Sequence, residues 1–214
     1  VTDALGKTTR YVFDVNCNLV KLIDPRYYTI DGEKKDPNII NTACRKEFEY
    51  DAQDRHVKTK VVDSTGAFVV VEYKEYDGRG NLTKEVDGEG YSSTNESNSI
   101  GYRYYYDVAD NLIKIISPAT AKYNNDNGKS EATKIYTYDG SGRVLTEVDA
   151  NVFTGEFVGK NTTTYSYYLN GQLKEKIYPD GLKESYNYDL TGNMEITKTD
   201  RAKNKTKYYN TVFN

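Results

Sequence analysis

The sequence contains very little histidine, methionine and cysteine, no tryptophan and no long run of apolar residues. It has one His, one Met, no Trp, two Cys and four Pro in 214 residues. The single histidine, His56, is the only residue around which a histidine-based catalytic triad could form. No apolar run approaches the ~20 residues that a transmembrane helix needs, and residues 1–7 have no signal-peptide pattern. We therefore expect no membrane insertion, and we expect any targeting signal to lie in a larger parent protein.

The sequence also lacks an excess of charge of one sign. Its 29 Lys and Arg and 32 Asp and Glu are interspersed and give a net charge of -3. Without a basic stripe, nucleic acid is not an expected partner. Only 37% of the residues are hydrophobic, which would be typical of a disordered chain if the sequence did not contain 22 Tyr and 6 Phe. A Tyr ring buries a large area while its hydroxyl stays in water, so this composition favours a thin, Tyr-rich sheet.

The few candidate metal ligands do not form a recognisable metal site. Cys17 and Cys44 are not spaced as CxxC and have no His companions, so zinc is not predicted. The segment 124–128 is rich in Asn and Asp, but its spacing does not match a calcium loop. A bridge between the two cysteines and two free thiols both remain open, and we favour free thiols. We expect no cofactor.

One short pattern recurs seven times along the chain, and YTYDGSGRVLTEVD at 136–149 is its clearest copy. The aromatic residue before the turn is Phe13, Tyr50, Tyr76, Tyr106, Tyr138, Tyr167 or Tyr188. The next residue is Asp14, Asp51, Asp77, Asp107, Asp139 or Asp189, with Tyr168 in its place in the sixth copy. Tyr, Val, Leu and Ile alternate with polar residues around each turn, so each copy is predicted to be a β-hairpin.

Turn chemistry supports the hairpin interpretation. Asp is favoured at the first position of a type I turn, and a left-handed residue at the fourth position completes a three-residue hairpin loop. That fourth position holds Gly80, Gly142, Gly171, Gly192, Asp54 or Asp110. Cys17 departs from the pattern, and we expect the first hairpin to be strained or differently turned.

The loop length predicts the register of each hairpin. Tyr138 is expected to face Val144, and Tyr136 to face Thr146, with Asp139 opposite Arg143. Tyr136, Tyr138, Val144 and Val148 would then share one face of the sheet. The same rule pairs Tyr76 with Leu82, Tyr106 with Leu112, Tyr167 with Leu173, Tyr188 with Met194 and Tyr50 with His56. On the opposite face it pairs Asp77 with Asn81, Asp51 with Arg55 and Asp189 with Asn193.

The copies predict an all-β fold made of tandem antiparallel hairpins in one long, curved or spiralling sheet. We expect a single repeat domain over 1–214, with hairpins at about 9–24, 46–63, 73–87, 102–117, 134–149, 163–180 and 184–200. The stretches 25–43, 88–101, 117–131 and 150–162 are rich in turn formers and are expected to be solvent loops. About fourteen strands would leave the two sheet ends unpaired, so we expect the chain to be a piece of a larger protein.

These copies resemble the YD-repeat or Rhs family, whose signature of an aromatic residue, Tyr-Asp, two variable residues, Gly, Arg or Asn, and Leu is met almost literally from Tyr138 to Val144. The resemblance implies a sheet that spirals into a hollow shell and, in bacterial members, encloses or presents a C-terminal toxin. It also implies a secreted or cell-surface location. The self-cleaving segment of shell-forming members is not recognised here. Carbohydrate binding has been attributed to such repeats.

Two functions from different classes follow from this sequence. The first is a non-catalytic scaffold, a wall segment of an Rhs shell whose partners are the remaining repeats and the C-terminal effector of the parent. The alternative is an adhesion module that binds glycans through tyrosine-lined sheet faces. We expect no enzyme activity, because His56 takes the leucine position facing Tyr50 and the turn aspartates already have a structural role.

Overall fold

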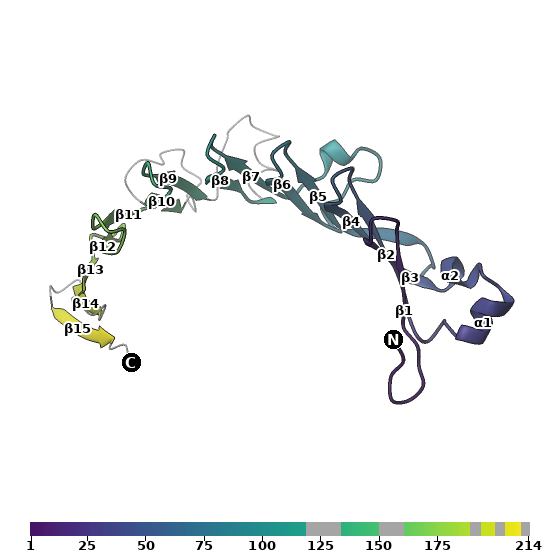
Figure 1. Ribbon diagram of the computed structural model, residues 1–214. Coiled ribbons are helices and arrows are strands. Elements are labelled where there is room, and N and C mark those ends of the chain that lie inside the picture. The colour runs from purple at the N-terminus through teal and green to yellow at the C-terminus, as the bar shows by residue number, and fades with distance from the viewer. Residues whose placement is uncertain (119–133, 150–160, 189–193, 200–203, 211–214) are drawn as a thin grey trace. The chain divides into compact units, whose positions relative to one another are not determined.

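The computed structural model describes residues 1–118, 134–149, 161–188, 194–199 and 204–210. Within these residues fifteen antiparallel strands follow one another in chain order in one open sheet. The strands are β1 Arg10–Phe13, β2 Leu19–Ile23, β3 Cys44–Tyr50, β4 His56–Val62, β5 Phe68–Tyr76, β6 Leu82–Asp87, β7 Tyr102–Tyr106, β8 Leu112–Ile116, β9 Lys134–Tyr138, β10 Val144–Asp149, β11 Thr162–Tyr167, β12 Leu173–Ile177, β13 Lys183–Tyr188, β14 Met194–Thr199 and β15 Lys205–Asn210. The predicted all-β hairpin fold is therefore confirmed (Figure 1).

The chain divides into two compact units, Val1–Arg103 and Tyr104–Asn214. The first contains β1 to β6 and three short helices, α1 Ile30–Lys35, α2 Ile39–Thr42 and the 3-10 helix η1 Glu96–Asn98. The second contains β8 to β15. None of the helices in the described ranges has the length and apolar character required to cross a membrane.

The segment 25–43 is not the solvent loop that we predicted. It forms α1 and α2 (Figure 1) and supplies part of the core of the first unit. Tyr28, Ala43 and the adjacent Cys44 are buried together with Ile23 of β2. The side chain of Thr29 caps α1 by accepting a hydrogen bond from the N–H of Gly32 at 3.0 Å. A single sheet buries few apolar side chains by itself. The segment 25–43 therefore contributes to one of the two buried hydrophobic clusters among the described residues.

The segment 88–101, here called the strap, is the second correction of this kind. It connects β6 to β7, contains η1, and lies against one face of the sheet over β5 (Figure 1). Ser99 is fully buried and accepts a hydrogen bond from the N–H of Ser92 at 2.9 Å. The strap approaches the sheet backbone so closely that a Cβ atom at Gly101 would lie 2.1 Å from the carbonyl oxygen of Glu85. Composition predicted a loop here, but not that it packs.

The registers next to the turns agree with prediction. Tyr50 pairs with His56, Tyr76 with Leu82, Tyr138 with Val144, Tyr167 with Leu173 and Tyr188 with Met194. The aromatic–aliphatic pair before the turn is therefore a repeated unit of this sheet.

Beyond that first pair the predicted register is wrong. Tyr136 pairs with Glu147 and not with Thr146, because a bulge at Leu145 shifts the pairing by one residue. Val148 consequently pairs with Ile135 and does not share a face with Tyr136. The same shift follows the first pair in five hairpins, at Val20, Val57, Thr83, Leu145 and Lys174. A one-residue bulge moves every later side chain to the other face.

The second unit has a thinner core in its described part. Ile116 of β8 is buried and packs against the half-buried Ile135 of β9. The stretches predicted as loops at 117–131 and 150–162 lie almost entirely outside the described residues. The same is true of Asp189, Gly192 and the rest of the seventh turn.

Candidate functional site: the turn ladder

The repeated Asp organises each turn through its carboxylate. Oδ1 of Asp139 accepts hydrogen bonds from the N–H groups of Ser141 at 2.9 Å and Arg143 at 3.0 Å. Its Oδ2 accepts one from Nε of Arg143 at 2.7 Å. The same two backbone bonds recur at Asp14, Asp51, Asp77 and Asp107. The turn aspartate makes these two backbone hydrogen bonds in each of the five described turns that have it.

The fourth turn position adopts the left-handed backbone that turn chemistry predicts. Its φ angle is 76° at Gly142 and 99° at Gly80, and Gly171, Asp54 and Asp110 are also positive. Cys17 has a φ of 67°, and the N–H of Asp14 donates to the carbonyl of Asn18 as in the other turns. The first turn therefore has the same form as the others, and of the two alternatives expected for it the strained one holds, because a non-glycine residue occupies the left-handed position.

The residue after the left-handed position reaches the next turn of the same unit. Nη1 of Arg55 donates to the carbonyl of Asp77 at 2.9 Å, and its guanidinium lies 4.7 Å from the centre of the Tyr76 ring. In the second unit, Arg143 lies 4.9 Å from the centre of the Tyr167 ring and donates to the carbonyl of Tyr168 at 3.5 Å. We call these contacts between successive turns the turn ladder.

A tyrosine hydroxyl forms a second link between neighbouring hairpins. The hydroxyl of the residue before the turn donates to the carbonyl that opens the return strand of the preceding hairpin. These links join Tyr50 to Leu19 at 2.9 Å, Tyr76 to His56 at 3.1 Å, Tyr138 to Leu112 at 2.7 Å and Tyr167 to Val144 at 2.8 Å. We call each one a tyrosine staple. Sequence reasoning placed these rings correctly but missed the role of the hydroxyl.

The staples satisfy carbonyls that the sheet leaves without a strand partner. The pairing of β4 with β5 begins at Lys58 and Tyr73, so the His56 carbonyl lies beyond it. The pairing of β8 with β9 begins at Lys114 and likewise stops short of Leu112. Buried backbone carbonyls need a donor, and the tyrosine supplies it from the next hairpin. The recurrence of Tyr before the turn therefore has a specific physical reason.

The hydrogen bonds of the turns shift the pKa values of the turn aspartates. Hydrogen bonds from the side chain and backbone of Arg143 lower the pKa of Asp139 below its ordinary value of 3.8. The backbone hydrogen bond from Asn81 has the same effect on the pKa of Asp77. Burial of the ring raises the pKa of the staple hydroxyl of Tyr138, which keeps the donor protonated. Each group is held in the ionisation state that its hydrogen bonds require.

His56 and the cysteines do not form a reactive group. Nε2 of His56 is 2.9 Å from the carbonyl of Lys58 and 3.0 Å from Oγ1 of Thr59, and its ring contacts Tyr50 edge-on at 5.7 Å. Both thiols are free, Cys17 on the surface and Cys44 in the core. Burial raises the pKa of the Cys44 thiol, which disfavours the nucleophilic thiolate. Within the described ranges no cluster of His, Cys, Asp and Glu could hold a metal ion.

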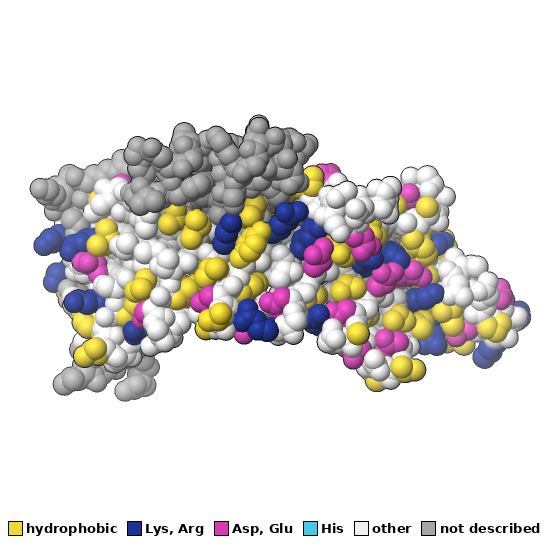
Figure 2. Space-filling view, turned by 90° about the horizontal axis from the view of Figure 1, so that it is seen from above, with side chains coloured by type: hydrophobic (Ala, Val, Ile, Leu, Met, Phe, Trp, Pro, Cys, Tyr) yellow, Lys and Arg dark blue, Asp and Glu magenta, His cyan; other side chains and the backbone are white. Residues whose placement is uncertain are grey.

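Charges of both signs are distributed over the surface. Seen from above, acidic and basic side chains lie next to one another, and the coloured side chains show no large area of one sign (Figure 2). Cross-strand pairs account for much of this pattern, including Lys21 with Glu47 at 3.4 Å and Lys134 with Glu147 at 2.9 Å. On the face that Figure 2 shows, the described basic residues are therefore interspersed with acidic ones.

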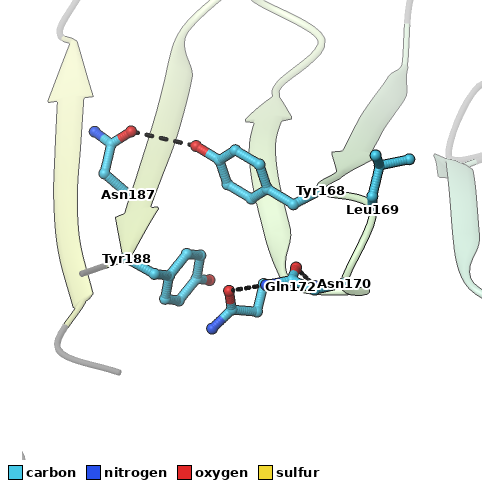
Figure 3. A pocket seen from close by; sticks show the side chains of 6 residues that line it. All are labelled: Tyr168, Leu169, Asn170, Gln172, Asn187 and Tyr188. Atoms are coloured by element: carbon cyan, nitrogen blue, oxygen red, sulfur yellow. Dashed lines mark hydrogen bonds between the residues drawn. The ribbon is translucent and has the colours of Figure 1, made fainter. Parts of the chain in front are cut away.

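A pocket of about 450 Å³ lies where the sixth copy departs from the repeat. Tyr168 replaces the turn Asp, and its hydroxyl donates to the carbonyl of Tyr186 at 3.0 Å and lies 3.3 Å from Oδ1 of Asn187. Figure 3 shows the Tyr168 and Tyr188 rings at this pocket, and Leu169 pointing away from Asn187. The remaining described lining residues are the amides Asn170 and Gln172, and none of the described residues that line the pocket is charged.

Comparisons with known proteins identify the repeat. Residues 76–122 match the family model described as RHS Repeat, which confirms the predicted resemblance. The sequence matches no curated protein.

Several solved structures share the fold. They include TcdB2-TccC3-Cdc42 at 15% identity and a TM-score of 0.53, and TcdB2-TccC3 without its hypervariable C-terminal region at 15% and 0.52. The Tc holotoxin pore of Photorhabdus luminescens matches at 15% and 0.50. In each case the likeness covers 94% of this chain and 11% of the other chain. This chain thus spans about a tenth of the length of those it resembles, and the likeness shows the fold.

Proposed function

Because the chain carries an RHS repeat and has the fold of chains in TcdB2-TccC3 structures, we propose that it is a wall segment of an Rhs shell. In this proposal the chain has no catalytic role. It encloses or presents a C-terminal effector of a secreted or surface-exposed parent protein, with the remaining repeats of that parent as its other partners. The observation that carries the proposal is the turn ladder, because it repeats the same links between successive hairpins.

The links support a wall because each one joins only nearest neighbours. A staple and an Arg–carbonyl contact tie one hairpin to the next, so hairpins can be added without redesigning the contacts already made. In five hairpins a bulge follows the residue pair next to the turn, and a bulge increases the local twist of a sheet. These hairpins therefore twist at equivalent positions. A sheet assembled in this way extends by repetition, as an enclosing wall requires.

The test uses the full-length parent protein and measures protease protection of its C-terminal part. We expect that part to resist proteinase K while the wall is intact. The double variant Tyr138→Phe and Tyr167→Phe removes two staples without removing the rings, and it should make the C-terminal part cleavable at lower protease concentration. Equal cleavage of the C-terminal part in the intact protein and in the free polypeptide would contradict enclosure.

The pocket beside Tyr168 favours a second candidate function, the binding of a glycan. Aromatic rings stack on sugar faces and amides exchange hydrogen bonds with hydroxyls, and both kinds of group line this pocket. The substitution Tyr168→Asp restores the repeat residue while removing one aromatic wall. An oligosaccharide that raises the melting temperature of the native chain but not of Tyr168→Asp would support this function. No stabilisation by a broad oligosaccharide panel would exclude it.

A further inference from the structure

The strap 88–101 is anchored to the sheet by a compact ionic cluster rather than by apolar packing alone. Oε1 of Glu96 on the strap lies 2.5 Å from Nζ of Lys58 on β4. The same oxygen accepts a hydrogen bond from the hydroxyl of Tyr91 at 2.7 Å. Glu96 is therefore the point at which the strap meets a cation of the sheet.

A second cation lies beneath the strap. The Lys84 side chain on β6 is only 6% exposed, and its Nζ is 3.3 Å from Oε1 of Glu75 on β5. The same Nζ donates to the carbonyls of Glu96 at 3.3 Å and Ser97 at 3.5 Å. Two strap carbonyls thus complete the hydrogen bonding of a buried ammonium group, which would be costly to leave without partners.

The strap also covers aromatic and aliphatic surface. The Tyr91 ring meets the Tyr73 ring edge-on at 5.6 Å, and Val86 is 1% exposed. The carbonyl oxygen of Gly90 accepts a hydrogen bond from the N–H of Ile100 at 2.8 Å. A Cβ atom on Gly90 would lie 1.9 Å from the carbonyl oxygen of Ile100, so only glycine fits here. Lifting the strap would therefore expose Tyr73, Tyr91 and Val86 together.

We propose that the strap is a conformational clasp, held closed by the charge of Glu96, which opens locally to expose this aromatic patch when that charge is removed. The proposal goes beyond the shell-wall function and does not depend on it. The charged and titratable groups facing the cluster are Glu49 of β3, Lys58 and Lys60 of β4, Tyr73 and Glu75 of β5, Lys84 of β6, and Tyr91 and Glu96 of the strap.

The direction of the pH response follows from these contacts. The hydrogen bond from Lys58, followed by that from Tyr91, lowers the pKa of Glu96 below its ordinary value of 4.5. Its contribution to closure is therefore complete above that ordinary value and is lost as the pH falls through the lower pKa of the closed state. Protonation leaves Lys58 with Glu49, at 3.6 Å, as its remaining carboxylate partner.

The substitution Glu96→Gln isolates this effect at neutral pH, where the turn aspartates stay ionised. Hydrogen exchange should become about tenfold faster at the N–H groups of Ser92 and Ile100, the change expected from losing one charge-assisted contact. Glu89→Gln is the matched control, because Glu89 is exposed on the same strap. Lys58→Met removes the other partner and should accelerate the same amides.

The reactivity of a buried thiol distinguishes global unfolding of the first unit from local opening of the strap. In a Cys17→Ser background the only thiol is Cys44, which is 1% exposed in the core of the first unit. The clasp predicts faster strap exchange while Cys44 stays unreactive toward a maleimide. Equal exchange in Glu96→Gln and Glu89→Gln, or labelling of Cys44 at the rate at which the strap opens, would overturn the proposal.

Discussion

The hydroxyl of Tyr138 donates a hydrogen bond to the carbonyl oxygen of Leu112 at 2.7 Å and so joins one hairpin to the hairpin before it. The two residues are 26 positions apart in the sequence. The bond lies beyond the backbone pairing of β8 with β9, which begins at Lys114 and Ile135. It accounts for the tyrosine of the repeat more specifically than hydrophobic burial does, because phenylalanine would fill the same space.

Replacing that tyrosine by phenylalanine should weaken the second unit. Tyr138→Phe leaves the Leu112 carbonyl without its side-chain donor, and we expect a loss of about 1 kcal/mol in the free energy of unfolding. Urea denaturation followed by tyrosine fluorescence measures it. Tyr136→Phe is the control, since this ring lies on the same strand and its hydroxyl has no hydrogen-bond partner among the described residues. Equal losses in the two variants would show that the staple has no energetic role.

The left-handed turn position predicts a contrast between two glycines of one turn. Gly142 has a φ of 76° and lies near Oδ1 of Asn111, whereas Gly140 has open space around it. Gly142→Val should destabilise the unit by about 1–2 kcal/mol, the cost of a left-handed non-glycine residue. Gly140→Val should be nearly neutral, because Val15 and Val108 hold the equivalent position in other copies. Thermal unfolding distinguishes them, and a neutral Gly142→Val would refute the turn assignment.

The first turn offers the reverse experiment. Cys17 occupies the left-handed position with a φ of 67°, so Cys17→Gly should raise the unfolding free energy by about 0.5–1 kcal/mol. Asp54→Gly should not give this gain, because Oδ1 of Asp54 accepts hydrogen bonds from Asn16 and Asn18 of the preceding turn. Differential scanning calorimetry of both variants tests the comparison. A less stable Cys17→Gly would contradict the strain that we assign to Cys17.

The turns were accessible from the sequence because their determinants are local. An Asp that bonds N–H groups two and four residues later and a left-handed residue three positions later are sufficient to define the loop. The pairs Tyr76 with Leu82 and Tyr167 with Leu173 follow directly from that loop length. The left-handed backbone at Gly142 could be predicted from the same local turn pattern.

The bulges and the packing of the segments 25–43 and 88–101 could not be predicted, because no local sequence pattern marks them. Val57, Thr83 and Lys174 occupy equivalent bulges and share no side-chain property that marks a bulge. The strap is held by Lys58 of β4 and by Lys84 of β6, the strand that leads into it, and in the sequence both read as ordinary exposed lysines. Tertiary contacts, which no single segment encodes, hold the strap in place.

Acid should weaken the turns in a defined direction. The pKa of Asp139 is lowered by its hydrogen bonds with Arg143, so its stabilising contribution is complete above 3.8 and is lost as the pH falls through the lower folded-state pKa. Asp139→Asn should therefore be less stable at pH 7 and should lose less additional stability between pH 5 and pH 2. Asp31→Asn, at an exposed position of α1, is the control. Identical acid profiles for native protein and Asp139→Asn would contradict this account.

In the proposed function the hairpins extend a wall by repetition and do not close into a self-contained domain. Small-angle X-ray scattering of the purified chain, with its mass verified by light scattering, distinguishes an extended sheet from a closed domain. A compact domain of 214 residues would have a radius of gyration of about 17 Å. We predict a monomer or edge-paired particle with a clearly larger value and an asymmetric distance distribution. A compact monomer near 17 Å would contradict the wall and make a self-contained binding domain the better interpretation.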